Sequence, residues 1–168
     1  MRKIGYTTLQ REIERRLKAN NKARELLGME LKKPLVALSD YNVYITDNYS
    51  MFFVIPKEDY ILPYDYNTDM STFEKYINTD RSFRLWYEDD AIDLKCPKRD
   101  LSRYCAYIKD DDGKIKDTVK IYFVKSLLQR FYKDIHKLHL YNNGTKDGIT
   151  HIYRNGVLVG IIAPFMKD

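Results

Sequence analysis

The sequence predicts an α+β fold made of two units that each run strand, helix, strand, strand, strand. The last third of the chain, residues 119–165, gives the clearest version of this order. Apolar side chains recur there first at helical spacing and then in the alternation of half-buried strands. Asn155-Gly156 separates two apolar runs, and this pair tolerates the two positive φ angles of a type I′ hairpin turn.

Length and composition favour one soluble domain. The 168 residues, 44% hydrophobic and 32% charged, are enough for a sizeable core. No apolar run approaches the roughly 20 residues that span a bilayer, and residues 1–6 contain no signal-peptide core. We therefore expect residues 1–168 to form a single cytoplasmic domain with no membrane association.

Charge is distributed unevenly along the chain, although the net charge is only +5. Residues 1–33 carry ten basic and four acidic side chains, residues 34–93 four and twelve, and residues 94–168 fifteen and eight. This basic–acidic–basic pattern indicates that one face could meet a polyanion while another meets a different partner. Scattered solvating charge explains the totals equally well.

The first unit, at about residues 2–56, begins with an expected strand at residues 2–6 and a helix capped by Thr7. Leu9, Ile13 and Leu17 form the buried line of this helix, which Asn20-Asn21 is expected to interrupt before Gly28. Three short strands should follow, at residues 35–38, 43–46 and 51–55. Four cations at helical spacing form one stripe, Arg11, Arg15, Lys18 and Lys22.

This stripe has two interpretations. Four cations on one helix face could follow the phosphates of a nucleic acid, with binding that weakens steeply as salt rises. Alternatively the stripe is a solvated helix face, an interpretation that Glu12–Arg16 and Glu14–Lys18 pairs at i, i+4 would support.

The middle segment, residues 57–116, is poorly patterned. We expect an edge strand and turn at residues 60–66, a short helix at 71–77, a strand at 83–87, a helix at 98–108 and a turn at 110–113. Asp89, Asp90 and Asp93 are interpreted as a charged loop. The second unit, residues 117–166, should contain a strand, a helix and three strands; the buried stripe of that helix is Val124, Leu127, Leu128 and Phe131.

No sequence motif indicates a reaction. The chain lacks GxGxxG, P-loop, HExxH and paired CxxC patterns. His136, His139 and His151 are expected in the closing strands as structural residues, and Cys96 and Cys105 as reduced structural thiols. We therefore expect a non-enzymatic protein with no metal and no cofactor.

Two segments carry a family resemblance. Residues 44–51, YITDNYSM, resemble the strand and turn of bacterial sliding clamps, the processivity factors of DNA polymerase, where Ala-Thr-Asp-Gly precedes a polar pair and Leu. Thr46, Asp47 and Met51 match, whereas Asn48 replaces Gly and Tyr49-Ser50 replace the polar pair. Residues 158–166, LVGIIAPFM, are similar to the last clamp strand, with Pro164 as the match. Residues 119–128 also resemble the strand-to-helix entry of a clamp unit.

This resemblance implies a DNA-clamp-like domain with two helices packed on curved antiparallel sheets. Six such units form a clamp ring, so a chain with two units would act as a homotrimer around double-stranded DNA. The implied DNA-facing residues are Arg11, Arg15, Lys18, Lys22, Lys125, Arg130 and Lys133. The positions that resemble the lining of a partner-peptide pocket are Thr46, Asn48, Tyr49, Met51, Ile162, Pro164 and Phe165.

The sequence thus supports two hypotheses. The first is a non-enzymatic sliding or tethering factor of DNA replication, from a phage or other mobile element, that binds DNA non-specifically and recruits a protein partner. The alternative is a monomeric protein-interaction module that mimics or regulates a replication or repair partner without encircling DNA.

Overall fold

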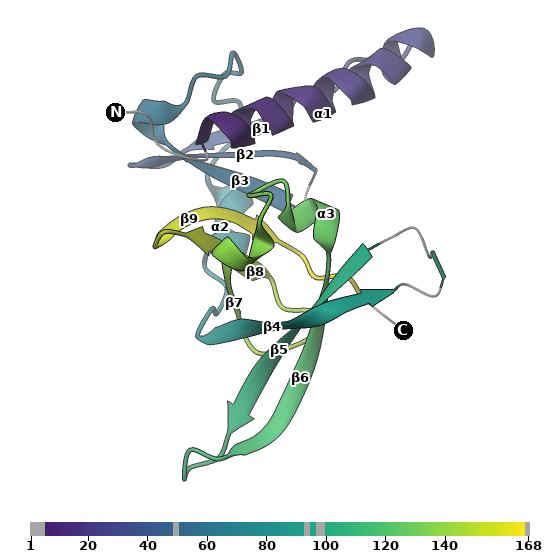
Figure 1. The fold of residues 1–168 in the computed structure, drawn as a ribbon. Coiled ribbons are helices and arrows are strands. Elements are labelled where there is room, and N and C mark those ends of the chain that lie inside the picture. The colour runs from purple at the N-terminus through teal and green to yellow at the C-terminus, as the bar shows by residue number, and fades with distance from the viewer. Residues whose placement is uncertain (1–5, 49–50, 93–94, 97–99, 167–168) are drawn as a thin grey trace. The chain divides into compact units, whose positions relative to one another are not determined.

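The computed structural model describes residues 6–48, 51–92, 95–96 and 100–166, with the side chains of residues 6–8 and 48 left aside. The chain divides into two compact units, Met1–Ile77 and Asn78–Asp168 (Figure 1), and each is described by itself. Helices and antiparallel strands occur in both units, which confirms the α+β class. The expected single domain stays a prediction.

The first unit contains one long helix, three strands and a short helix. In chain order these are α1 (Tyr6–Leu26), β1 (Leu35–Leu38), β2 (Asn42–Asn48), β3 (Met51–Pro56), the 3₁₀ turn η1 (Lys57–Asp59) and α2 (Ser71–Ile77). The strands form an antiparallel meander in which β2 pairs with both β1 and β3. The three strands and α2 closely match the sequence prediction.

Both helices of the first unit contribute buried side chains to the core that covers its sheet. Leu9, Ile13 and Leu17 of α1 are almost fully buried, as predicted from their spacing. Phe73 of α2 packs against Phe52 and Tyr44, with ring centroids 5.1 and 6.0 Å apart. Because every side chain of β3 from Met51 to Ile55 is buried, this strand is the centre of the unit's core.

The predicted break at Asn20-Asn21 is wrong, because α1 continues to Leu26. A tertiary contact offsets the weak helix propensity of Asn21: its side-chain amide donates to Lys32 O at 3.0 Å and accepts from Lys32 N at 2.7 Å. The helix ends at Gly28, whose φ of 69° and flanking 6→1 bond from Met29 N to Arg24 O define a Schellman cap. Of the expected strand at residues 2–6, residues 2–5 lie outside the described residues.

The edge strand expected at residues 60–66 is absent from the described structure, and the chain there is irregular. Buried Gln10 of α1 explains this local path. Its amide donates to Asp59 O at 3.0 Å and accepts from Ile61 N at 2.7 Å, so the backbone bonds to a side chain in place of a neighbouring strand.

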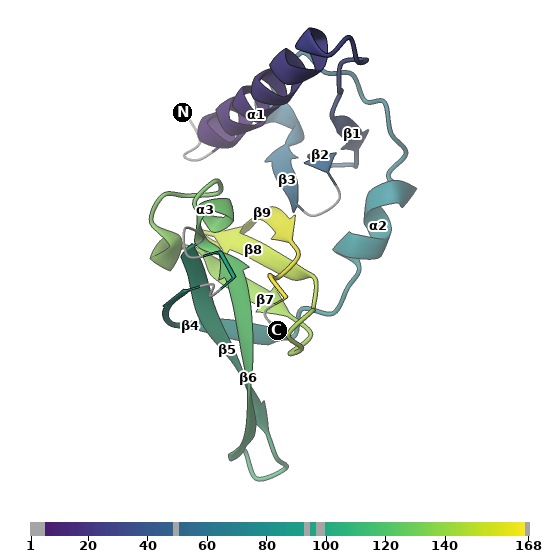
Figure 2. The same ribbon diagram turned by 90° about the vertical axis from the view of Figure 1, so that its right-hand side faces the viewer.

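The second unit is an antiparallel sheet in the order β9-β8-β7-β4-β5-β6. Its elements are β4 (Phe83–Ile92), β5 (Asp100–Lys109), β6 (Ile115–Val124), α3 (Lys125–Leu128), the 3₁₀ turn η2 (Ile135–Lys137), β7 (His139–Asn142), β8 (Thr150–Arg154) and β9 (Val157–Ile162). The β5–β6 hairpin is the long arm seen in Figure 2. Strands β4 and β5 lie between β6 and β7, so the predicted second unit is not contiguous in the sheet.

Strand β4 has different partners along its length. Phe83, Arg84 and Leu85 pair with β7, whereas the residues from Trp86 to Ile92 pair with β5. The helix predicted at residues 98–108 is wrong: residues 98–99 lie outside the described residues, and residues 100–108 belong to β5, paired on one side with β4 and on the other with β6. Non-local pairing decides such a segment, because strand formation depends on cross-strand packing more than on local preference.

The helix predicted around Val124–Phe131 is one turn long. Leu128 and Phe131 are buried as expected, but the chain after α3 continues through 3₁₀-type bonds such as Phe131 N to Leu128 O. This path brings the Phe131 ring onto Gly160, where a Cβ atom would lie 1.9 Å from Cε1. His136 lies in η2 and not in a strand, which corrects a second expectation for this region.

The closing hairpin is confirmed. Asn155 and Gly156 connect β8 to β9 with φ angles of 52° and 76°. Both values fall in the left-handed region that a type I′ turn requires, and Asn and Gly are the residues that adopt it at least cost.

The contact between Phe131 and Gly160 generates a test of packing in the second unit. Replacement of Gly160 by Ala should lower the free energy of unfolding by about 1–3 kcal/mol, because the new methyl group forces the Phe131 ring out of its place. Urea unfolding followed by circular dichroism measures this loss. The control is Val157→Ala, a replacement at an exposed position three residues before Gly160. Equal stability of G160A and wild type would contradict the packing of Phe131 on Gly160.

Candidate functional site

The cations of α1 form an exposed basic row on the helix face opposite the buried line of Leu9, Ile13 and Leu17. We use "basic row" for Arg11, Arg15, Lys18 and Lys22, which are all exposed. Arg16, in contrast, turns inward, and its Nη2 lies 3.3 Å from Oδ2 of buried Asp47 on β2. This ion pair joins α1 to the sheet and thereby fixes which face of the helix remains in solvent.

The two ion pairs expected along this helix, Glu12–Arg16 and Glu14–Lys18, are not formed in the described part of the chain. Arg16 contacts Asp47 instead of Glu12, and Lys18 makes no ion pair with Glu14 among the described residues. Arg15 does bind Glu12, with Nη2 and Oε1 2.7 Å apart, and this carboxylate raises the pKa of Arg15. Arg11, Lys18 and Lys22 keep their charges without a counter-charge in the described structure.

The other implied DNA-facing residues are not arranged as a helical row. Lys125 begins the single turn of α3, and its Nζ lies 3.0 Å from Oδ2 of Asp90. Arg130 and Lys133 follow the helix; Arg130 is half-buried and Lys133 is exposed. The four predicted cations of α1 therefore lie together in the basic row, whereas Lys125, Arg130 and Lys133 are dispersed.

The residues implied in a peptide pocket fall in both units. Thr46 and Met51 are buried in the first, where Thr46 Oγ1 donates to Met51 O at 2.6 Å. Ile162 is 2% exposed in the second, and Pro164 and Phe165 are half-buried. Phe165 N donates to Tyr122 O at 2.7 Å. The side chain of Asn48 and the whole of Tyr49 lie outside the described residues.

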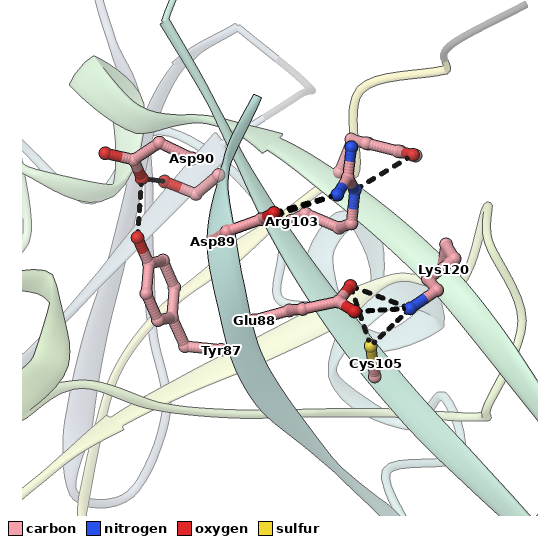
Figure 3. Close-up of polar contacts among 9 residues, drawn as sticks. Tyr87, Glu88, Asp89, Asp90, Arg103, Cys105 and Lys120 are labelled. Carbon is pink, nitrogen blue, oxygen red and sulfur yellow. Dashed lines mark hydrogen bonds and ion pairs between the residues drawn. The ribbon is translucent and has the colours of Figure 1, made fainter. Parts of the chain in front are cut away.

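Sequence reasoning missed a charged strip along β4, β5 and β6, in which Glu88 and Asp89 lie on one face of the sheet and Asp90 on the other (Figure 3). Tyr87 pairs with Tyr104 and Asp89 with Arg103, so Glu88 is an extra residue in a β-bulge. The bulge turns Glu88 and Asp89 to the same side. The charged loop expected at Asp89, Asp90 and Asp93 is wrong for the first two, which belong to β4 with Glu88 and find their cationic partners on other segments; Asp93 lies outside the described residues.

Each carboxylate of the strip has its own cation. Asp89 accepts two hydrogen bonds from Arg103 Nη1, at 2.9 and 3.0 Å, and Arg103 also donates to the Tyr122 hydroxyl. Glu88 lies 2.6 Å from Lys120 Nζ. The Lys120 hydrogen bond lowers the pKa of Glu88, and the Lys125 hydrogen bond lowers the pKa of Asp90.

Cys105 lies among these charges without being activated by them. Its thiol donates to Glu88 Oε2 at 3.3 Å and accepts from Lys120 Nζ at 3.4 Å. Burial and the adjacent Glu88 carboxylate raise the pKa of the Cys105 thiol, so the nucleophilic thiolate is disfavoured. The described residues also contain no cluster of three or more side chains suited to holding a metal ion.

On the face of the sheet that carries Asp90, aromatic packing holds Tyr87 in place. Its ring contacts His136 and Tyr104 edge-on at 4.6 and 5.6 Å, and its hydroxyl donates to Asp90 at 2.8 Å. Desolvation, followed by the hydrogen bond to Asp90, raises the pKa of Tyr87 to about 12, so the hydroxyl remains a donor at neutral pH.

No family model, curated protein or solved structure gives a significant match to this chain. None of the helices in the described ranges has the length and apolar character needed to cross a bilayer. Arguments about function therefore depend on the placement of the residues themselves.

The lowered pKa values of Glu88 and Asp90 predict a loss of stability in acid. Both carboxylates are more acidic in the folded chain than their ordinary values of 4.5 and 3.8, so their pairing stabilises the fold above those values. The contribution disappears as pH falls through the lowered folded-state pKa values. Thermal unfolding measures this between pH 7 and pH 2.5. The melting temperature of Glu88→Gln should lie below that of wild type at neutral pH, and the two melting temperatures should converge in acid.

The exposed replacement Glu30→Gln provides the matched control, because Glu30 makes no side-chain contact with a described residue. Its melting temperature should follow that of wild type across the pH range. A Glu88→Gln difference that persists unchanged to pH 2.5 would contradict the electrostatic origin.

Proposed function

We propose that this protein is a non-enzymatic tethering factor that holds double-stranded DNA through the basic row of α1. The carrying observation is a 21-residue helix with four exposed cations on one face and a buried apolar line on the other. From Arg11 to Lys22 the row extends about 16 Å along the helix axis. Point charges of this kind contact phosphates without reading bases, so binding is sequence-independent.

The clamp resemblance extends this proposal to a DNA-clamp-like protein. A long helix followed by the β1–β2–β3 meander, and the short α3 followed by β7, β8 and β9, keep the order helix, strand, strand, strand in each unit. Since α3 is one turn, each copy would bring a single long helix to the DNA. A homotrimer around the duplex, a cytoplasmic location and an origin in a phage or mobile element belong to the same proposal.

Charge reversal of the basic row tests DNA binding. Arg15 is paired with Glu12, so phosphate contacts by Arg11, Lys18 and Lys22 predict that log K falls against log salt with a slope of about −2.7. Replacement of Arg11, Arg15 and Lys18 together by Glu should abolish binding of a random-sequence duplex. Fluorescence anisotropy measures this binding between roughly 50 and 200 mM salt, the range over which the release of DNA counterions changes the affinity most clearly.

The matched control changes Lys114, Lys116 and Lys146 to Glu, which alters the net charge equally at exposed positions of the other unit. This variant should bind DNA with a near wild-type slope. Equal loss in both variants would indicate a general charge effect, and retained binding in the α1 variant would remove the proposal.

A second candidate is the monomeric protein-interaction module, which one observation favours. Four apolar side chains are exposed where α1 ends and the next segment begins, with Leu26 81% and Leu27 73% exposed, followed by Met29 and Leu31. Contiguous exposed apolar residues are typical of protein-interaction surfaces. Such a module would mimic or regulate a replication or repair protein without encircling DNA.

The mass of the protein in solution separates these functions. Light scattering on a sizing column should give a species near three times the 20.1 kDa chain mass for a ring-forming tether. A 20.1 kDa monomer without DNA affinity would contradict the tether and favour the interaction module.

A further inference from the structure

The second unit has an apolar groove that neither function above uses. It has a volume of about 550 Å³ and is lined by Phe83, Arg84 and Trp86 of β4, Tyr107 and Lys109 of β5, and Ile115 of β6. Trp86 is 46% and Ile115 56% exposed, which is unusual for side chains of this size.

The change of partner along β4 creates this groove. Pairing between β4 and β5 ends at Trp86 and Cys105, because the preceding residues of β4 pair with β7. Strand β5 continues to Lys109 with β6 as its described partner on one side only. Ala106 is fully buried, so the edge that is open towards the groove consists of residues 107–109, about 10 Å at the usual rise per residue.

The cations in the groove differ from those of the neighbouring strip. Arg103, Lys120 and Lys125 each bind a carboxylate. Arg84 and Lys109 form no ion pair with any described residue, and Arg84 instead stacks on Trp86 with its guanidinium carbon 4.0 Å from the ring centroid. No described lining residue of the groove is acidic.

We propose that the groove binds an extended acidic–apolar segment of a partner protein, which adds as a strand to residues 107–109 of β5. An open strand edge supplies backbone hydrogen bonds, and alternate side chains of the added strand face the groove. Apolar side chains of that segment contact Trp86, Tyr107 and Ile115. Its carboxylates bind Arg84 and Lys109.

These observations favour a peptide over a single-stranded nucleic acid. Base stacking needs an open aromatic face, and Arg84 already covers one face of Trp86. A strand edge is recognised through peptide groups, which a nucleic acid lacks. The proposal is independent of DNA binding by α1, because the groove and the basic row belong to different units.

Trp86 is the only tryptophan of the chain, so its fluorescence reports directly on the groove. The probe is the capped octapeptide Glu-Glu-Val-Val-Glu-Glu-Val-Val, which presents alternating acidic and apolar side chains on both faces of a strand. We expect saturable change of Trp86 fluorescence below about 1 mM peptide, the weak end of specific binding. The same peptide with Lys for Glu should bind at least about tenfold more weakly, since it meets Arg84 and Lys109 with like charge.

Two sets of variants test the parts of the proposal. Arg84→Gln with Lys109→Gln should weaken binding about tenfold, whereas Lys114→Gln with Lys116→Gln, on the same hairpin outside the groove, should not. The octapeptide can turn either of its equivalent faces to the groove, so the backbone test uses the same peptide methylated at every peptide nitrogen, which should not bind because it has no N–H group left to donate to β5.

No fluorescence change with the parent peptide, undiminished binding of the fully N-methylated peptide, or unchanged binding by the Arg84/Lys109 variant would each overturn the proposal. A decamer of thymidylate that binds where the octapeptide does not would assign the groove to single-stranded nucleic acid instead. Near-ultraviolet circular dichroism verifies that each variant is folded.

Discussion

Strand β4 is the constraint on which the second unit depends. Its first three residues pair with β7 and the remainder with β5, so one strand joins the β7–β8–β9 sheet to the long β5–β6 hairpin. A strand that changes partner must diverge from one neighbour, and the divergence leaves the edge of β5 open. The β-bulge at Glu88 then turns two consecutive carboxylates to one face. Groove and charged strip are thus two consequences of the same strand.

In the first unit, polar contacts decide how α1 can be used. Burial of Leu9, Ile13 and Leu17 fixes the inner face of the helix, and the Arg16–Asp47 ion pair and the Gln10 hydrogen bonds add directional contacts to it. A buried ion pair contributes little net stability but favours one orientation, because the alternatives leave a charge unpaired. Because Arg16 is bound inside, Glu12 pairs with Arg15, and the other three cations of the basic row stay exposed without a counter-charge in the described structure.

Local patterns predicted those elements that short-range physics controls. The buried line of α1, the strands near residues 35–55, α2 and the Asn155-Gly156 hairpin all depend on neighbours in sequence. The predictions failed where a distant partner decides. Residues 100–108 belong to β5 because β4 and β6 lie on either side, and the helix after Val124 is short because Phe131 packs on Gly160.

The same division applies to the candidate sites. The sequence by itself determined the α+β class, the spacing of Arg11, Arg15, Lys18 and Lys22 on one helix face, and the absence of a recognised catalytic motif. Only the tertiary structure decided which charges are paired, that Cys105 is held as a thiol, and that Trp86 and Tyr107 share a groove. The reason is physical: helical periodicity is fixed by the local backbone. Ion pairs and grooves instead require residues far apart in sequence to meet, such as Lys120 with Cys105, 15 residues apart, and Lys125 with Asp90, 35 residues apart.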